Sequence, residues 1–280
     1  MTKCPPKALL LDMDGVLYHG IHRLPFAAEF LAMIARVPHL FLTNNPVATP
    51  AQVAERLRSM GLGSPRPAQI LTSGVATAHW LNAQCPGFRY FAVGAEGLDK
   101  ELSRYGLADE QEPDYVVVGE GPGLDYASLT KGINLVLKQG AELISTNPDH
   151  LVDAHAEGQH QVLPGGGALV AAFEVACGVK ARTIGKPQPL LFDMAMRLLG
   201  VSPAQCLMVG DRPDTDIAGA QRLGMQTAMV RTGRFSIKAA WPAQQPPADW
   251  DVADLQQLAE AWGRAWPGWP PTKKPAGPAR

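Results

Sequence analysis

The chain has 280 residues, of which 46% are hydrophobic and 18% are charged, and its formal net charge is -1. This composition is typical of a globular protein with a full hydrophobic core, and it gives no sign of a surface that binds nucleic acids or membranes. The four cysteines are far apart and form no C-x-x-C pair, so the sequence suggests neither a zinc site nor a disulfide framework, and a cytoplasmic location is expected.

Strand and helix patterns alternate along the chain. A short apolar run at residues 7–11 ends at Asp12, and the runs at residues 38–43 and 205–211 likewise end in a polar side chain. Such runs predict strands that are covered on both faces. Helical patterns lie between them, at residues 26–36, 51–60, 73–84, 190–199 and 214–223. The alternation predicts an α/β fold with a mostly parallel sheet and helices on both of its faces.

The middle of the chain repeats this alternation on its own. Residues 88–93, 115–118 and 141–146 are strand-like, and residues 126–139 are helix-like. We therefore predict an inserted cap domain at residues 77–182, between two parts of a core domain at residues 1–76 and 183–262. The proline-rich residues 263–280 are predicted to form an unfolded tail.

The first chemical signal is Asp12-Met-Asp14-Gly15, at the end of the first predicted strand. The period of a strand sends both carboxylates toward the same side. Two carboxylates this close repel each other unless a cation neutralises them or one is protonated, and Mg²⁺ is a suitable hard cation. Considered alone, the pair also fits an ordinary turn that aspartates cap.

Polar side chains follow other predicted strands too. In parallel α/β sheets, ligands bind beyond the carboxyl ends of the strands, which gathers Asp12, Thr43 and Asp211 at one edge. Thr43 and Asn44 offer a hydroxyl and backbone N–H groups to an anionic phosphoryl oxygen, although a plain turn is an alternative. Lys186 could offset the carboxylates, although lysines are more often solvated.

Together these residues resemble the four motifs of the haloacid dehalogenase superfamily, in the expected order. Asp12-x-Asp14-Gly-Val is similar to its nucleophile motif, and Thr43, Lys186 and Gly-Asp211-x-x-x-Thr-Asp216 are similar to the other three. Two further stretches resemble the signature of the NagD-like subclass IIA, namely Ser145-Thr-Asn147-Pro-Asp149 and Pro164-Gly-Gly-Gly167. That subclass contains nucleotide, p-nitrophenyl phosphate, phosphoglycolate and pyridoxal phosphate phosphatases. The resemblance implies a Rossmann-like core with an inserted α/β cap of the C2 type.

The resemblance also implies a mechanism. Asp12 is expected to attack phosphorus and form an aspartyl-phosphate, with Asp14 as general acid and then general base. Mg²⁺ is expected on the Asp12 carboxylate, the Asp14 backbone carbonyl and Asp211, with Asp216 as an outer partner. The remaining roles are charge neutralisation by Lys186 and phosphoryl binding by Thr43 and Asn44.

In the cap, the resemblance implies that Asn147 and Asp149 face the active site and contact the substrate. The alternative is a simple turn there, with the glycines at 165–167 as a hinge. The expected partner is a small-molecule phosphate ester, with no nucleic acid and no membrane, and related proteins suggest a homodimer. A phosphotransferase or mutase would use the same aspartate, and a phospho-aspartate receiver module is a further alternative.

Overall fold

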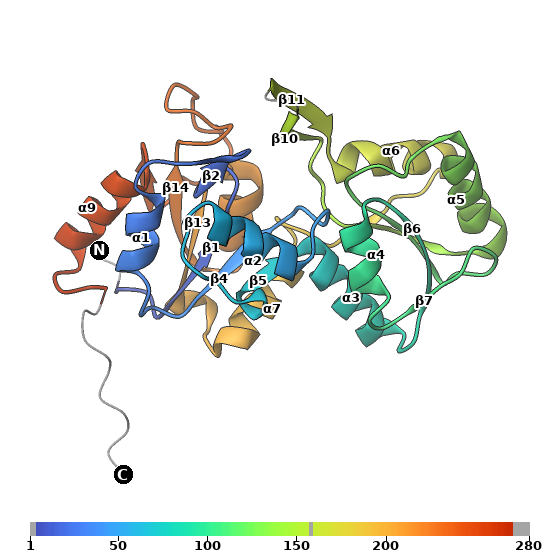
Figure 1. The fold of residues 1–280 in the computed structure, drawn as a ribbon, viewed down its shortest axis with the longest axis horizontal. Coiled ribbons are helices and arrows are strands. Elements are labelled where there is room, and N and C mark those ends of the chain that lie inside the picture. Colours follow the sequence, from blue (N-terminus) through green and yellow to red (C-terminus); the bar gives the residue numbers. More distant parts are fainter. Residues whose placement is uncertain (1–3, 157–158, 271–280) are drawn as a thin grey trace, which may run out of the picture. The chain divides into compact units, whose positions relative to one another are not determined.

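The computed structural model describes residues 4–156 and 159–270, and its chain forms two compact units. The first unit contains Met1–Leu42, Glu55–Pro65 and Phe192–Arg280, and the second contains Thr43–Ala54 and Arg66–Leu191. The second unit includes the whole of the predicted cap, residues 77–182, whose own boundaries stay a prediction. Figure 1 shows the elements of both units in the colours of the sequence.

The first unit is built on a parallel sheet with the strand order β15-β14-β13-β1-β4. Every residue of β1, β13 and β14 is buried, because helices and loops cover the sheet on both faces. Leu10 of β1 lies opposite Met208 of β13 and Leu40 of β4, so the neighbouring strands end at one edge. The strands are β1 (Ala8–Leu11), β4 (His39–Thr43), β13 (Cys206–Gly210), β14 (Gln226–Val230) and β15 (Trp250–Val252).

Short elements and helices surround this sheet. A small antiparallel hairpin, β2 and β3, follows β1, and a π-helical segment, Pro213–Ile217, follows β13. The bounds are β2 (Tyr18–His19), β3 (His22–Arg23), α1 (Ala27–Met33), α2 (Pro50–Ser59), α7 (Pro189–Leu199), α8 (Ala218–Arg222) and α9 (Leu255–Ala265). The chain passes between the units four times, namely at the end of β4 after Leu42, within α2 after Ala54, after Pro65, and within α7 after Leu191.

An aromatic cluster joins the C-terminal part of the chain to the first unit. Trp262 of α9 is fully buried, with its ring 5.6 Å from that of Phe30 on α1 and 5.1 Å from that of Trp269. Figure 1 shows α1 and α9 side by side. The predicted start of the unfolded tail, at residue 263, therefore falls inside α9, and Trp266 is also buried. The rest of that predicted tail, residues 271–280, lies outside the described residues.

The second unit has its own parallel sheet, with the strand order β12-β9-β8-β6-β7. Val116 and Val118 of β8 pack with Leu135 of α5 and Phe173 of α6 in one core cluster. The strands are β5 (Ile70–Thr72), β6 (Arg89–Val93), β7 (Leu107–Ala108), β8 (Tyr115–Val118), β9 (Glu142–Ser145) and β12 (Arg182–Thr183), of which β5 is outside this sheet. The helices are α3 (Ser73–Gln84), α4 (Glu96–Leu102), α5 (Tyr126–Gln139) and α6 (Gly166–Cys177).

Local sequence signals explain how α5 begins and ends. The Asp125 side chain accepts a hydrogen bond from the Ser128 N–H at 2.7 Å, and Gly140 adopts the left-handed conformation that closes a helix.

A separate antiparallel hairpin, β10 (Leu151–Ala156) and β11 (Gln159–Pro164), precedes α6. The predicted α/β fold, with a parallel core sheet and a second parallel sheet in an inserted part, is confirmed.

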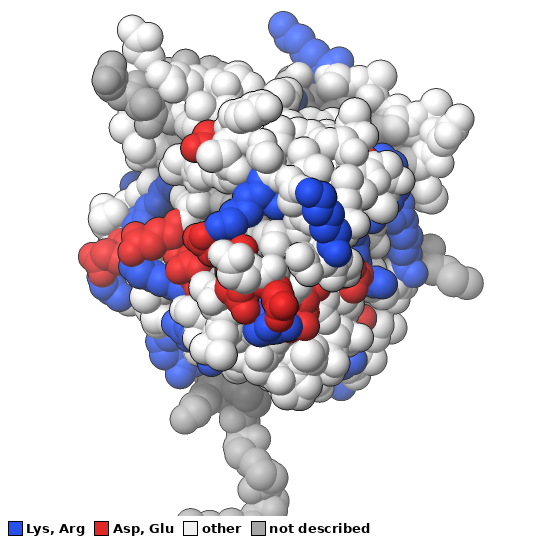
Figure 2. Space-filling view, turned by 90° about the vertical axis from the view of Figure 1, so that its right-hand side faces the viewer, with Lys and Arg blue, Asp and Glu red and all other residues white. Residues whose placement is uncertain are grey.

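Charged side chains on the second unit are of both signs. On the face drawn in Figure 2, a band of acidic side chains has basic side chains beside it. In this unit Arg89 pairs with Asp109 at 3.4 Å, and Arg182 pairs with Glu142 at 2.8 Å. The drawn face is therefore not the extended basic surface that nucleic acids require. Within the described residues, no helix combines the length and the apolar character that a membrane crossing needs.

Candidate active site

Three buried carboxylates meet in the first unit. Asp12 follows β1, Asp211 follows the neighbouring strand β13, and Asp216 lies in the π-helical segment just beyond. One carboxylate oxygen from each residue lies within 4.8 Å of those of the other two. The exposed fractions are 9% for Asp12, 4% for Asp211 and 1% for Asp216. Adjacent parallel strands end at the same edge of the sheet, which is why residues 199 positions apart lie together.

This group fits a divalent metal ion. Three carboxylates in so small a buried volume repel one another strongly unless a cation or protons neutralise them. All three donors are hard oxygen atoms, the kind that Mg²⁺, Ca²⁺ and Mn²⁺ prefer. Asp216, expected as an outer partner, also offers an oxygen within this 4.8 Å limit, and it accepts a hydrogen bond from the Arg212 N–H at 3.2 Å.

Asp14 has different surroundings from Asp12. Its side chain is 47% exposed and lies 3.5 Å from His19 Nδ1, whereas Asp12 is buried. Strand β1 already ends at Leu11, so the period-two geometry of a strand does not extend to Asp14. The chain then turns at Gly15, which has a φ of 79°. Two carboxylates in such unlike environments are suited to different chemical roles.

The loop after β14 contributes two residues that the sequence reasoning missed. Thr232 Oγ1 donates a hydrogen bond to the Gly15 carbonyl at 2.6 Å. Gly233 packs so closely on Asp211 that a Cβ atom at position 233 would overlap the carboxylate. The sequence signal that could have identified these two residues is the one used for the other strand ends. A strand-like stretch, residues 227–230, is followed directly by Arg-Thr-Gly.

For the phosphate esters that the resemblance implies, we expect the Gly233→Ala variant to lower kcat/KM by about 10- to 100-fold, because its Cβ displaces Asp211, an expected metal ligand. Steady-state kinetics over a range of Mg²⁺ concentrations measure the effect. The matched control is Gly263→Ala on α9, where no atom lies within 4 Å of the added methyl group. Equal kcat/KM in the two variants would show that the close packing on Asp211 is dispensable.

The second unit holds the other predicted site residues. Thr43 ends β4, and its Oγ1 accepts a hydrogen bond from the Asn45 N–H at 3.1 Å. The buried side chain of Asn44 forms a two-way pair with the backbone of Lys186: its Oδ1 accepts from the Lys186 N–H at 2.7 Å, and its Nδ2 donates to the Lys186 carbonyl at 2.9 Å. Residues 142 positions apart are thereby held together.

Asn147 and Asp149 are buried within the second unit. Asp149 Oδ2 accepts a hydrogen bond from Asn44 Nδ2 at 3.0 Å, and Asn147 Nδ2 donates to the Asn44 carbonyl at 2.8 Å. The segment at residues 165–167 packs closely on this loop, since a Cβ at Gly165 would overlap the Asp149 carbonyl. These side chains therefore fasten the loop to Asn44, and their expected contact with substrate stays a prediction.

The chain is similar to known hydrolases over most of its length. A family model described as haloacid dehalogenase-like hydrolase matches residues 9–108, and a second, described as HAD-hydrolase-like, matches residues 183–258. An acid sugar phosphatase of Staphylococcus aureus is 36% identical over 255 residues, which cover 90% of this chain and 96% of that protein.

Two solved structures are similar along most of the chain. A 4-nitrophenylphosphatase from Thermotoga maritima has a TM-score of 0.83 and 31% identity, over 91% of this chain and 97% of its own. NagD from E. coli K-12 has a TM-score of 0.79 and 31% identity, over 90% of this chain and 98% of its own. The likeness therefore includes both units rather than the core alone.

Proposed function

Since the chain belongs to the haloacid dehalogenase-like hydrolases, in the subclass of NagD and the p-nitrophenyl phosphatases, we propose that it hydrolyses small phosphate monoesters in a Mg²⁺-dependent reaction with Asp12 as the nucleophile. It is thus a phosphoric monoester hydrolase. The observation that carries the proposal is the buried group of Asp12, Asp211 and Asp216, because it combines a nucleophile at a strand end with a place for a cation.

The proposed reaction has two displacements at phosphorus. A carboxylate oxygen of Asp12 attacks, the bond from phosphorus to the ester oxygen breaks, and Asp14 gives its proton to the leaving oxygen. Water then attacks the aspartyl-phosphate, Asp14 takes the proton of that water, and inorganic phosphate leaves with the Asp12 carboxylate restored. The exposure of Asp14 suits this role, because the proton must reach a leaving group and then a water molecule.

Other residues are proposed to bind the phosphoryl group. The ammonium of Lys186 offsets its negative charge, and the Thr43 hydroxyl and the Asn44 N–H hold its oxygens in the reactive geometry. The ion would be held by the Asp12 and Asp211 carboxylates and the Asp14 carbonyl, with Asp216 beside them. When bound, Mg²⁺ supplies positive charge that offsets the repulsion between a carboxylate nucleophile and an anionic phosphate.

A phosphotransferase or mutase would form the same intermediate and pass the phosphoryl group to another hydroxyl. The amount of inorganic phosphate released for each ester consumed distinguishes the two. The receiver-type alternative loses its support, because the chain belongs to a family of hydrolases. Homodimer formation remains a prediction from the resemblance.

The proposed function is tested by phosphate release from a panel of esters with Mg²⁺ present. The panel contains p-nitrophenyl phosphate, sugar phosphates, nucleotides, phosphoglycolate, glycerol phosphate and pyridoxal phosphate. We expect turnover of p-nitrophenyl phosphate and preference for a sugar phosphate, given the similarity to an acid sugar phosphatase. One phosphate should appear for each ester consumed. If no compound of the panel releases phosphate, the proposal is wrong.

A further inference from the structure

A continuous chain of hydrogen bonds runs through the second unit from β8 to the proposed phosphate-binding residues. Glu120, two residues after β8, is only 2% exposed, and its Oε1 accepts a hydrogen bond from Asn147 Nδ2 at 3.0 Å. Asn147 Nδ2 also donates to the Asn44 carbonyl at 2.8 Å. The Asn44 side chain in turn holds the backbone of Lys186. Glu120 is thus linked to Lys186 by hydrogen bonds through Asn147 and Asn44.

The surroundings of Asn147 determine which way its amide faces. Its Oδ1 accepts a hydrogen bond from the Asp149 N–H at 3.0 Å, while the Asn44 carbonyl and the Glu120 carboxylate on the other side require a donor. The residue is fully buried, and a Cβ atom at Gly166 would already lie 3.0 Å from Asn147 Oδ1. Rotation of the amide would therefore break every one of these bonds and turn the amide oxygen toward the accepting Glu120 Oε1.

Asn44 is held both at its backbone carbonyl and at its side-chain amide. Its carbonyl accepts hydrogen bonds from Asn147 Nδ2 and from the Ser73 hydroxyl. Its amide pairs with the peptide groups of Lys186 and with the Asp149 carboxylate. A shift of Asn147 therefore moves the Asn44 main chain, whose N–H is proposed to bind a phosphoryl oxygen, and with it Lys186.

We infer that Glu120 is a positioning residue of the reaction, which acts through Asn147 on Asn44 and Lys186. The inference rests on the proposed function, because it concerns the placement of residues that bind the phosphoryl group. A hydrogen bond in a buried network is stronger than one in water, and a buried donor that loses its acceptor is costly. Small displacements of groups that bind a transition state have large effects on rate. Loss of the Glu120 acceptor should therefore lower the rate by displacing the groups that bind the phosphoryl group.

The test compares Glu120→Leu, which removes the acceptor, with Glu120→Gln, whose amide oxygen still accepts from Asn147. We expect Glu120→Leu to lower kcat/KM by about 10-fold or more, and Glu120→Gln to restore most of it. Because the defect lies on the phosphoryl side, the loss should be the same factor for p-nitrophenyl phosphate and for a sugar phosphate. If Glu120→Leu does not fold, Glu120→Asp replaces it, since its shorter side chain no longer reaches Asn147.

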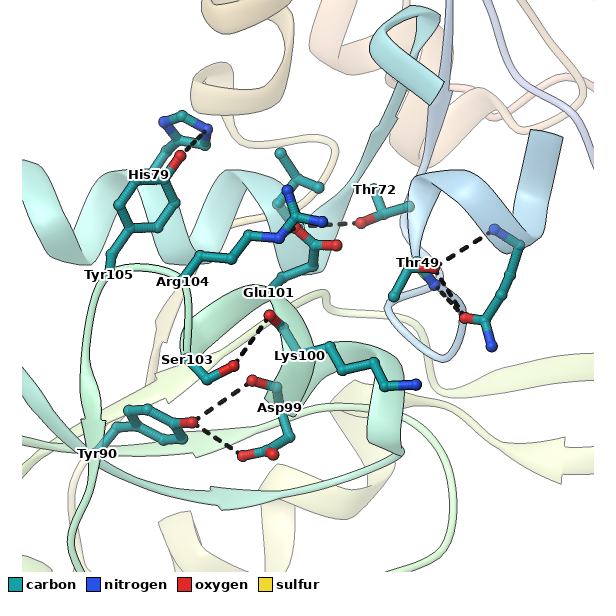
Figure 3. A network of polar contacts seen from close by, with 12 residues as sticks. Thr49, Thr72, His79, Tyr90, Asp99, Lys100, Glu101, Ser103, Arg104 and Tyr105 are labelled. Carbon is teal, nitrogen blue, oxygen red and sulfur yellow. Dashed lines mark hydrogen bonds and ion pairs between the residues drawn. The ribbon is translucent and has the colours of Figure 1, made fainter. Parts of the chain in front are cut away.

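A second buried glutamate provides the matched control. Glu101 on α4 is 3% exposed and pairs with Arg104 at 3.1 Å (Figure 3), whereas the carboxyl group that accepts from Asn147 is that of Glu120. Burial raises the pKa of Glu101, and the nearby Arg104 opposes that rise, so this carboxylate too is held in a poorly solvated place. Glu101→Leu should change the midpoint of thermal unfolding and leave kcat and KM as they are.

A double-mutant cycle with Asn147→Ala shows whether Glu120 acts through Asn147. The effect of Glu120→Leu on kcat/KM should disappear in the Asn147→Ala background, whereas additive effects would overturn the inference. If Glu120→Leu has the kinetics of the wild-type protein, the inference about Glu120 is wrong. The proposed function is then unaffected, since the wild-type protein still turns over its esters. Wild-type protein without turnover of any ester would overturn the proposed function, and the inference with it.

Discussion

The Asp12→Asn variant is expected to lose about 10⁴-fold or more in kcat with p-nitrophenyl phosphate and Mg²⁺. The amide has the shape of the carboxylate but is not a nucleophile, so the first displacement cannot occur. Binding of inorganic phosphate should be kept or improved, because the substitution removes a negative charge from the buried carboxylate group. The expected result is therefore a loss of kcat rather than a rise in KM.

Rapid quenching in acid with radiolabelled substrate tests the same residue directly. The wild-type protein should carry label as an aspartyl-phosphate, and Asp12→Asn should carry none. Asp12→Ala is the companion variant, since it cannot revert to aspartate by deamidation, and thermal unfolding confirms that both variants are folded. Turnover near the wild-type rate in either variant would end the assignment of Asp12 as the nucleophile.

Removal of divalent metal should lower the activity almost as much as the Asp12→Asn substitution. With excess chelator we expect hydrolysis to fall by about 10³-fold, because several kcal/mol of charge stabilisation in the transition state are lost. Mg²⁺ should also raise the midpoint of thermal unfolding, since an ion that binds only the folded state stabilises it, by about 2.7 kcal/mol at 100 times its Kd. Normal activity in chelator would contradict the metal assignment.

The Asp216→Asn variant tests, without an activity assay, whether Asp216 helps to bind the cation. Without metal, the variant should be at least as stable as the wild-type protein, because three buried carboxylates become two. With Mg²⁺, its gain in unfolding midpoint should be smaller than that of the wild type. Asp193→Asn on α7, outside the carboxylate group, is the control and should keep the full gain. An unchanged gain in Asp216→Asn would place Asp216 outside the metal site.

Much of the fold was predictable because its signals are local. Continuous apolar runs such as residues 8–11 and 206–210 identify buried parallel strands by themselves, and Asp125 and Gly140 mark the ends of α5. The tail was misjudged near its start for the opposite reason. Trp266 packs on Trp250, and Trp269 packs on Trp262, which in turn contacts Phe30. Contacts with other segments, and not the neighbouring prolines, therefore decide the structure of this part of the chain.

For the site, too, local sequence determined some features and the tertiary structure decided others. The sequence by itself determined the family, the nucleophile motif and which residues stand at strand ends, since these follow from residue type and short-range order. Only the tertiary structure decided that Asp216 joins Asp12 and Asp211, that Thr232 and Gly233 support the Gly15 turn, and that Asn147 and Asp149 bind Asn44. The physical reason is that hydrogen bonds and carboxylate clusters depend on distances of a few ångströms between segments more than 100 residues apart, which no local pattern of residue types encodes.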